Sequence, residues 1–148
     1  MIEIPELDKK RTQKSVENAL LDYRLYKHLT FDEREASVTS SIDEIGGGKS
    51  NLTSDQTGAI ATWNVDQQRA RSEYCKKIEQ VVKRLPTTEK FLVEERYMSV
   101  ESEYLTDYNV YCFKFDPPIS AMTYAAIRWK AFYKLALSLE IAIIKIDE

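Results

Sequence analysis

The chain has 148 residues, a length typical of one domain or of two small helical lobes, and it can bury a core without disulfides or metals. Charged residues make up 30% and hydrophobic residues 43%, as in ordinary soluble proteins. The net charge of −3 argues against indiscriminate nucleic-acid binding, which normally needs a basic surface.

The two cysteines, Cys75 and Cys112, lack CxxC spacing, so neither a zinc site nor a disulfide framework is predicted. The N-terminus lacks the apolar core of a signal peptide, and charged residues interrupt the longest apolar stretch. We therefore expect a cytoplasmic protein with no membrane contact, no cofactor and no metal.

The first predicted helix runs from about Lys9 to Leu29, with Leu7-Asp8 as hydrophobic staple and N-cap. Apolar residues recur at helical spacing at Val16, Ala19, Leu20, Tyr23 and Tyr26. Residues 9–28 carry an excess of basic over acidic side chains. Solubility is the common explanation for such a face, and phosphate contact is the alternative.

Residues 30–57 are rich in Ser, Thr, Asp and Gly and are predicted to form a loop, with a short helical turn near Asp32 to Ala36. The run GGGKS at 46–50 resembles part of a phosphate-binding loop. That motif needs Gly where this chain has Asp43, and no apolar strand leads into it. We therefore interpret 1–57 as an N-terminal helix with a flexible Ser/Gly linker, followed by a helical domain at 58–148.

A second long helix is expected from about Gly58 to Leu85, where Pro86 ends it. Thr87 or Thr88 is suited to cap the next helix, and 99–106 reads as a polar connection. The tail 140–146 fits a last helical turn, a short strand, or an apolar tail that packs on the first helix or on a second subunit.

Residues 107–115 predict a short apolar helix that Pro117-Pro118 must end, and Ser120 then caps a helix that reaches Leu139. One side of this last helix is apolar, while Thr123, Lys130 and Lys134 line the opposite side. A short helix, a turn and a basic-faced helix are the pattern of a helix-turn-helix, here at about 107–139. The predicted fold class is therefore all-α, with two long N-terminal helices followed by a three-helix unit that contains this motif.

Six residues of the last helix are predicted to contact DNA: Ser120, Thr123, Ala126, Trp129, Lys130 and Lys134. Lys130 and Lys134 are expected to contact phosphates, and the N-terminus of the helix is also suited to bind a phosphate. Trp129 fits DNA, a subunit interface or an inter-helix seam equally well. Tyr124 is expected in the core, and Arg128 is expected to snorkel or to pair with a carboxylate from the middle of the chain.

No catalytic constellation accompanies the single histidine, His28, so we do not expect an enzyme.

Several stretches resemble known families in order and type. Leu85-Pro86, Glu89, Tyr97, the short helix around Val110, Ile119-Ser120 and KAFYKL at 130–135 are similar to the domain with which bacterial sigma factors read the minus-thirty-five promoter element. The N-terminal IPELDKKRTQKSVENALLDYRLYK, GGGKSNLTSDQT and TYAAIRWKAFYKLA resemble the ArpU family of phage and prophage transcriptional regulators. This resemblance implies a sequence-specific DNA-binding protein that controls late phage genes for packaging or lysis.

Two features depart from that resemblance. Family members often carry bulky or basic residues where this chain has Ala125 and Ala126, and the turn FDPPIS is longer than in sigma factors. The rival hypothesis is a protein-interaction module, with RNA polymerase as its partner and a degenerate helix-turn-helix. A homodimer on a two-fold DNA site is compatible with either hypothesis.

Overall fold

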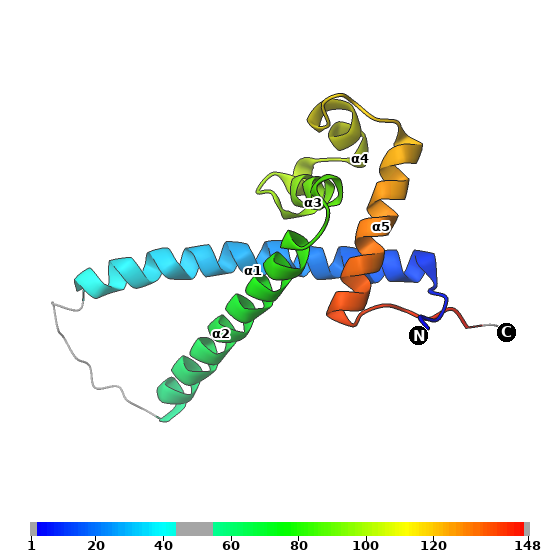
Figure 1. Ribbon diagram of the computed structural model, residues 1–148. Coiled ribbons are helices and arrows are strands. Elements are labelled where there is room, and N and C mark those ends of the chain that lie inside the picture. Colours follow the sequence, from blue (N-terminus) through cyan, green and yellow to red (C-terminus); the bar gives the residue numbers. More distant parts are fainter. Residues whose placement is uncertain (1–2, 44–54, 147–148) are drawn as a thin grey trace. The chain divides into compact units, whose positions relative to one another are not determined.

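The computed structural model describes the backbone of residues 3–43 and 55–146, and the side chains of residues 3–30 and 64–146. The regular secondary structure of these residues is helical, which confirms the all-α class. Five α-helices are labelled in Figure 1: α1 (Lys9–Asp43), α2 (Asp55–Lys83), α3 (Thr87–Val93), α4 (Asp107–Asn109) and α5 (Ala121–Leu139). No helix in the described part of the chain has the length and apolarity needed to cross a lipid bilayer.

Three short helical turns complete the element order of residues 3–43 and 55–146. The π-helical turn η2 (Glu94–Met98) continues α3, the 3-10 turn η3 (Ser102–Tyr104) follows it, and the π-helical turn η4 (Val110–Lys114) continues α4. The predicted polar connection at 99–106 therefore includes one helical turn.

The chain divides into two compact units. The first unit combines Met1–Arg24 with Ile78–Glu148, and the second is Leu25–Lys77. In the second unit the rings of Tyr26 and Tyr74 meet edge to face, with centroids 5.3 Å apart. Every residue predicted to contact DNA belongs to the first unit.

The predicted start of α1 is confirmed, and its predicted end is wrong. Asp8 caps the helix by accepting a hydrogen bond of 3.1 Å from the Arg11 amide. The helix continues past Leu29 to Asp43, and α2 begins at Asp55 rather than at Gly58. Residues 30–43 contain neither Gly nor Pro, so nothing in them stops a helix despite their many Ser and Thr residues. The GGGKS run lies outside the described residues.

The core of the first unit gathers apolar side chains from α1, α2, α3, η4 and α5. Phe132 of α5 is fully buried, and its ring packs on that of Tyr97 with centroids 5.4 Å apart. The other large apolar side chains that are fully buried are Val16, Leu20, Ile78, Val82, Leu92, Val93, Val110 and Leu135. This core fixes α5 on the rest of the unit.

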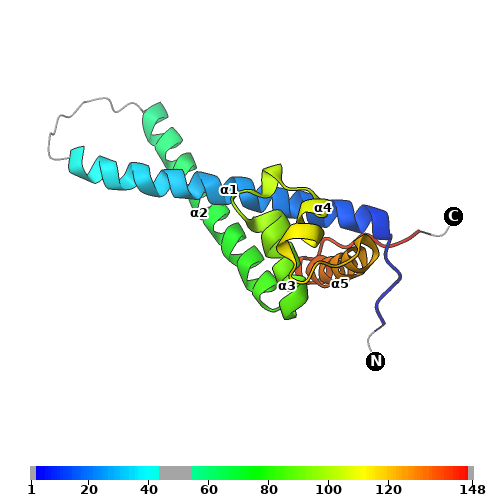
Figure 2. The same ribbon diagram turned by 90° about the horizontal axis from the view of Figure 1, so that it is seen from above.

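The chain after α5 returns to the start of α1, so the packing of the tail on the first helix is confirmed among the three alternatives (Figures 1 and 2). Glu140 ends α5 in the left-handed conformation, with φ of 60°. The Asp8 amide then donates to the carbonyl of Ile143 at 2.7 Å, and the Lys145 amide donates to that of Glu6 at 2.9 Å. These contacts bind the two ends of the unit together.

The prediction of a threonine cap on α3 is wrong. Pro86 occupies the N-cap position, with extended backbone, and no side chain caps the helix. Thr87 and Thr88 lie one and two positions further on, inside the first turn. A proline suits this place because its missing N–H has no helical partner to lose there.

Candidate nucleic-acid interface

The candidate interface is built on α4, η4, the following turn and α5. Thr106 and Asn109 cap α4 reciprocally: the Asn109 amide donates to Thr106 Oγ1 at 3.2 Å, and the Thr106 amide donates to Asn109 Oδ1 at 3.0 Å. After η4 the turn is held by the Ile119 amide, which donates to the carbonyl of Tyr111 at 3.1 Å. The short helix predicted at 107–115 is thus present as α4 and η4, and the turn brings the chain to Ser120.

Ser120 caps α5, as predicted. Its hydroxyl oxygen accepts a hydrogen bond of 3.1 Å from the Thr123 amide, and its O–H donates to Thr123 Oγ1 at 2.9 Å. Both residues are exposed. The start of α5 therefore presents two hydroxyl groups and the positive end of the helix dipole to solvent.

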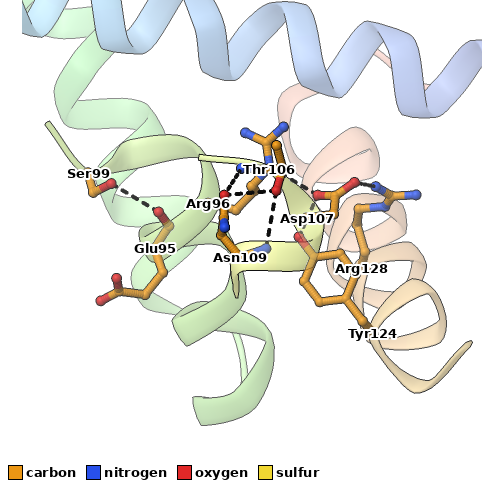
Figure 3. Close-up of polar contacts among 8 residues, drawn as sticks. All are labelled: Glu95, Arg96, Ser99, Thr106, Asp107, Asn109, Tyr124 and Arg128. Atoms are coloured by element: carbon orange, nitrogen blue, oxygen red, sulfur yellow. Dashed lines mark hydrogen bonds and ion pairs between the residues drawn. The ribbon is translucent and has the colours of Figure 1, made fainter. Parts of the chain in front are cut away.

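Asp107 holds the start of α5 in place through a polar cluster, formed by Asp107, Arg96, Tyr124 and Arg128 (Figure 3). The Tyr124 hydroxyl donates to Asp107 Oδ1 at 2.7 Å, and Arg96 Nε donates to the same oxygen at 3.0 Å. Arg128 Nη1 donates to Asp107 Oδ2 at 2.9 Å. The predicted pairing of Arg128 with a mid-chain carboxylate and the core position of Tyr124 are both confirmed.

Burial and charge in this cluster shift the acidity of its members. Burial, followed by the hydrogen bond to Asp107, raises the pKa of Tyr124 above its usual range. Burial opposes the charge of Arg128, but Tyr97 and Asp107 outweigh it, so the pKa of Arg128 is raised. The Tyr124 phenol therefore stays un-ionised at neutral pH beside the two guanidinium groups of Arg96 and Arg128. Sequence reasoning missed Asp107 because its partners come from two elements far from it in the chain, Arg96 from η2 and the pair Tyr124 and Arg128 from α5.

The side of α5 opposite the core forms an exposed surface that we call the outer face of α5, defined as Ser120, Thr123, Ala126 and Lys130. All four residues are exposed, whereas Ala131, Phe132 and Leu135 are buried on the opposite side. Lys130 forms no ion pair with the described side chains. The structure thus brings together four of the six predicted contact residues on one accessible surface.

Lys134 has a different neighbour from Lys130. Its ammonium group donates to both carboxylate oxygens of Glu89 at 2.9 Å. The Glu89 side chain is only 10% exposed, and that of Lys134 is 46% exposed. Because a buried carboxylate needs a partner, Lys134 serves the packing of α3 against α5. Its predicted phosphate contact stays a prediction.

Trp129 lies at a seam between α1 and α5. The ammonium group of Lys9 is 5.5 Å from the centroid of the Trp129 ring, and the Tyr133 ring follows one turn along α5 at 5.9 Å. The inter-helix alternative for Trp129 is therefore present in the structure, and its side chain is half-buried. Its predicted DNA contact is not tested by this packing.

A second exposed surface was missed by sequence reasoning. The rings of Tyr108 and Phe113 lie 6.0 Å apart on α4 and η4, and they are 56% and 72% exposed. The signal in the sequence is the aromatic-rich run DYNVYCFKF, which we interpreted only as an apolar helix. In residues 3–30 and 64–146, no three side chains of His, Cys, Asp or Glu gather closely enough to hold a metal ion.

These features define an all-helical protein whose capped last helix is anchored on one side and accessible on the other. No protein-family model matches the chain, and no solved structure matches it. The chain is similar to a protein of Listeria innocua serovar 6a described as the uncharacterized phage-related protein Lin1259/Lin1739. The two are 23% identical over 145 residues, which cover 98% of each chain.

Proposed function

We propose that this protein is a phage or prophage transcriptional regulator that reads duplex DNA with the outer face of α5. The observation that carries the proposal is the division of α5 into an anchored side and an accessible side. The Asp107 cluster and Phe132 hold the helix, while Ser120, Thr123 and Lys130 face solvent. The phage-related description of the Listeria protein supports the phage association.

Each residue of the outer face has a chemical role in this proposal. The hydroxyl groups of Ser120 and Thr123, together with the first amides of α5, suit a phosphate group. Ala126 carries only a methyl group, so the helix can approach a base edge closely and meet a thymine methyl. Lys130 supplies a sequence-independent phosphate contact.

The resemblance to the ArpU family extends the proposal to the control of late genes for packaging or lysis. A monomer with so few contact residues would read a short site. A homodimer on a two-fold site doubles the number of base contacts, and we include it in the proposal.

The exposed aromatic surface favours a second candidate function, a protein-interaction module that binds RNA polymerase. Tyr104 is 83% exposed, and Tyr108 and Phe113 are also exposed. Aromatic side chains are enriched at the centres of protein interfaces, and an exposed aromatic group has no role in phosphate binding. On this alternative, the surface on α4 and η4 contacts polymerase and α5 is only a scaffold.

The test is selection of random duplexes by the purified protein near physiological salt, followed by sequencing of the retained DNA. The proposal predicts an enriched motif for the wild type and for Lys77→Glu, a charge reversal in the second unit. It predicts loss of enrichment for Lys130→Glu.

The absence of any enriched motif with a folded, helical protein would contradict the proposal. Binding of that protein to core RNA polymerase, lost in Tyr108→Ala, would then establish the second candidate.

A further inference from the structure

We infer that the start of α1 binds the phosphate backbone of the duplex beside the site read by α5, through a basic edge defined as Lys9, Lys10 and Lys14. This inference rests on the proposed function, because it extends the same interface from one helix to two. The inference gives a role to the basic residues at the start of α1. These residues have no role when α5 alone reads DNA.

The placement of the basic edge follows from the contact between Lys9 and Trp129. The Lys9 ammonium group is 5.5 Å from the centroid of the Trp129 ring. Trp129 adjoins Lys130 in the sequence and lies one turn after Ala126 on α5. The first turn of α1 therefore borders the outer face of α5.

Contacts between the tail and α1 fix the start of α1 on the same compact unit. Thr12 Oγ1 donates to the carbonyl of Ile143 at 3.2 Å, and the Ser15 hydroxyl donates to that of Ile141 at 3.0 Å. Thr12 and Val16 are fully buried, so this side of α1 faces the unit. The start of α1 and α5 belong to one compact unit, which a rigid two-helix interface requires.

The charges of the basic edge are available to a ligand. Lys9, Lys10 and Lys14 are exposed, and none of them forms an ion pair with the described side chains. Lys10 and Lys14 lie one turn apart, on the side of α1 away from Thr12 and Val16. Neighbouring Arg11 differs, because its guanidinium pairs with Asp8 at 3.7 Å.

DNA binding requires several positive charges close to the reading helix, and this requirement favours phosphate contact over solubility as the role of the basic edge. Lys130 is the one lysine of the outer face of α5, because Lys134 is paired with Glu89. Phosphate neutralisation by several cations supplies most of the sequence-independent affinity for duplex DNA. The chain is acidic as a whole, so the cations must be concentrated beside the reading helix. Lys9, the first residue of the basic edge, lies beside that helix against Trp129, and Lys10 and Lys14 follow it along the exposed flank of α1.

The experiment measures duplex affinity as a function of salt concentration for full-length variants. One variant replaces the basic edge (Lys9→Gln, Lys10→Gln and Lys14→Gln), and one replaces only Lys10 and Lys14, so that the Trp129 contact stays intact. The matched control removes the same charge from exposed lysines of α2 (Lys76→Gln, Lys77→Gln and Lys83→Gln). The probe is the duplex selected by the wild type, with a scrambled duplex beside it.

The expected result is a reduction of the log–log salt slope by about two to three units for the triple variant and about two for the double variant, since each phosphate contact contributes about 0.9. The preferred sequence should not change, and the α2 control should keep the wild-type slope. Equal slopes for the wild type and the basic-edge variants would overturn the inference while leaving the proposed function intact. A wild type that binds neither duplex, even at low salt, would overturn both.

Discussion

Two regions of α5, its outer face and the turn that meets α3, show how two lysines on one helical stripe acquire different roles. Lys134 reaches the buried carboxylate of Glu89, whereas Lys130, about one turn earlier, has no described partner and faces solvent. Helical periodicity places both residues on the side opposite Tyr124. Their roles differ because Lys134 lies next to α3, which supplies Glu89. The difference teaches that periodicity gives the position of a lysine on a helix, whereas the groups on neighbouring elements decide whether that lysine is free to bind a ligand.

The largest expected effect is on the inner face of α5, the buried side that contains Ala131, Phe132 and Leu135. Phe132→Ala removes a fully buried ring and should lower the free energy of unfolding by about 4 kcal/mol. Met122→Ala, on a side chain that is 84% exposed, should change it by less than about 0.5 kcal/mol. Chemical denaturation followed by circular dichroism measures both. Similar losses for the two variants would show that the assignment of the inner face is wrong.

The phenol that packs on Phe132 should make stability fall in alkali. Burial, followed by the charge of Asp107, raises the pKa of Tyr97 to about 12. The unfolded chain ionises this group near its ordinary value of about 10, so the folded state binds more protons between these values. The stabilisation is complete below pH 10, and the free energy of unfolding should drop by about 3 kcal/mol as the pH rises to 12.

Tyr97→Phe should remove that part of the alkaline loss, and Tyr104→Phe, on an exposed ring, should not. Denaturation curves between pH 8 and 12 test this difference. A Tyr97→Phe protein with an alkaline loss as large as that of the wild type would contradict the burial of an un-ionised phenol there.

The two lysines themselves give the next effect. Lys134→Met leaves the Glu89 carboxylate buried without its partner and should destabilise the fold by about 2 kcal/mol, less than for a fully buried pair because Lys134 is half exposed. Lys130→Met should be neutral for stability but should lower the salt slope of DNA binding by about one unit.

Adding Glu89→Gln to Lys134→Met should recover most of the lost stability, since no unpaired charge then remains buried. If a double-mutant cycle gave no coupling free energy between Glu89 and Lys134, the ion pair would not stabilise the fold as described.

The smallest effect concerns the cap of α5. Ser120→Ala removes the hydrogen bond to the Thr123 amide and should cost about 1 kcal/mol. Ser120→Asp keeps a capping oxygen and should retain the stability, but its charge opposes a phosphate at the same place. Duplex binding should therefore weaken by at least about tenfold in Ser120→Asp. Unchanged binding would place the phosphate elsewhere.

Local signals in the sequence predicted much of the helical structure. The caps at Asp8 and Ser120 and the spacing of Val16, Leu20 and Tyr23 required no knowledge of distant residues. The end of α1 was misplaced because Ser and Thr are poor helix formers yet do not break a helix. Composition alone could not show that the helix continues through 30–43.

The contacts that organise the candidate interface are long-range, and no spacing in the sequence identifies both partners of any one contact. Glu89 meets Lys134 across 45 residues, and Asp107 meets Arg128 across 21. For Arg128 the need for a carboxylate was predictable, because it falls among apolar residues of the helix. For Lys134 no such conflict exists, and its position on the polar side gave no indication of a buried partner.

The most direct test of the central claim is a nuclear magnetic resonance titration of the labelled protein with its selected duplex. We predict that the amide signals of Ser120, Thr123, Ala126 and Lys130 shift most, and that those of Tyr108 and Phe113 remain in place. Shifts confined to Tyr108 and Phe113, or no shifts at all, would contradict the reading of DNA by the outer face of α5.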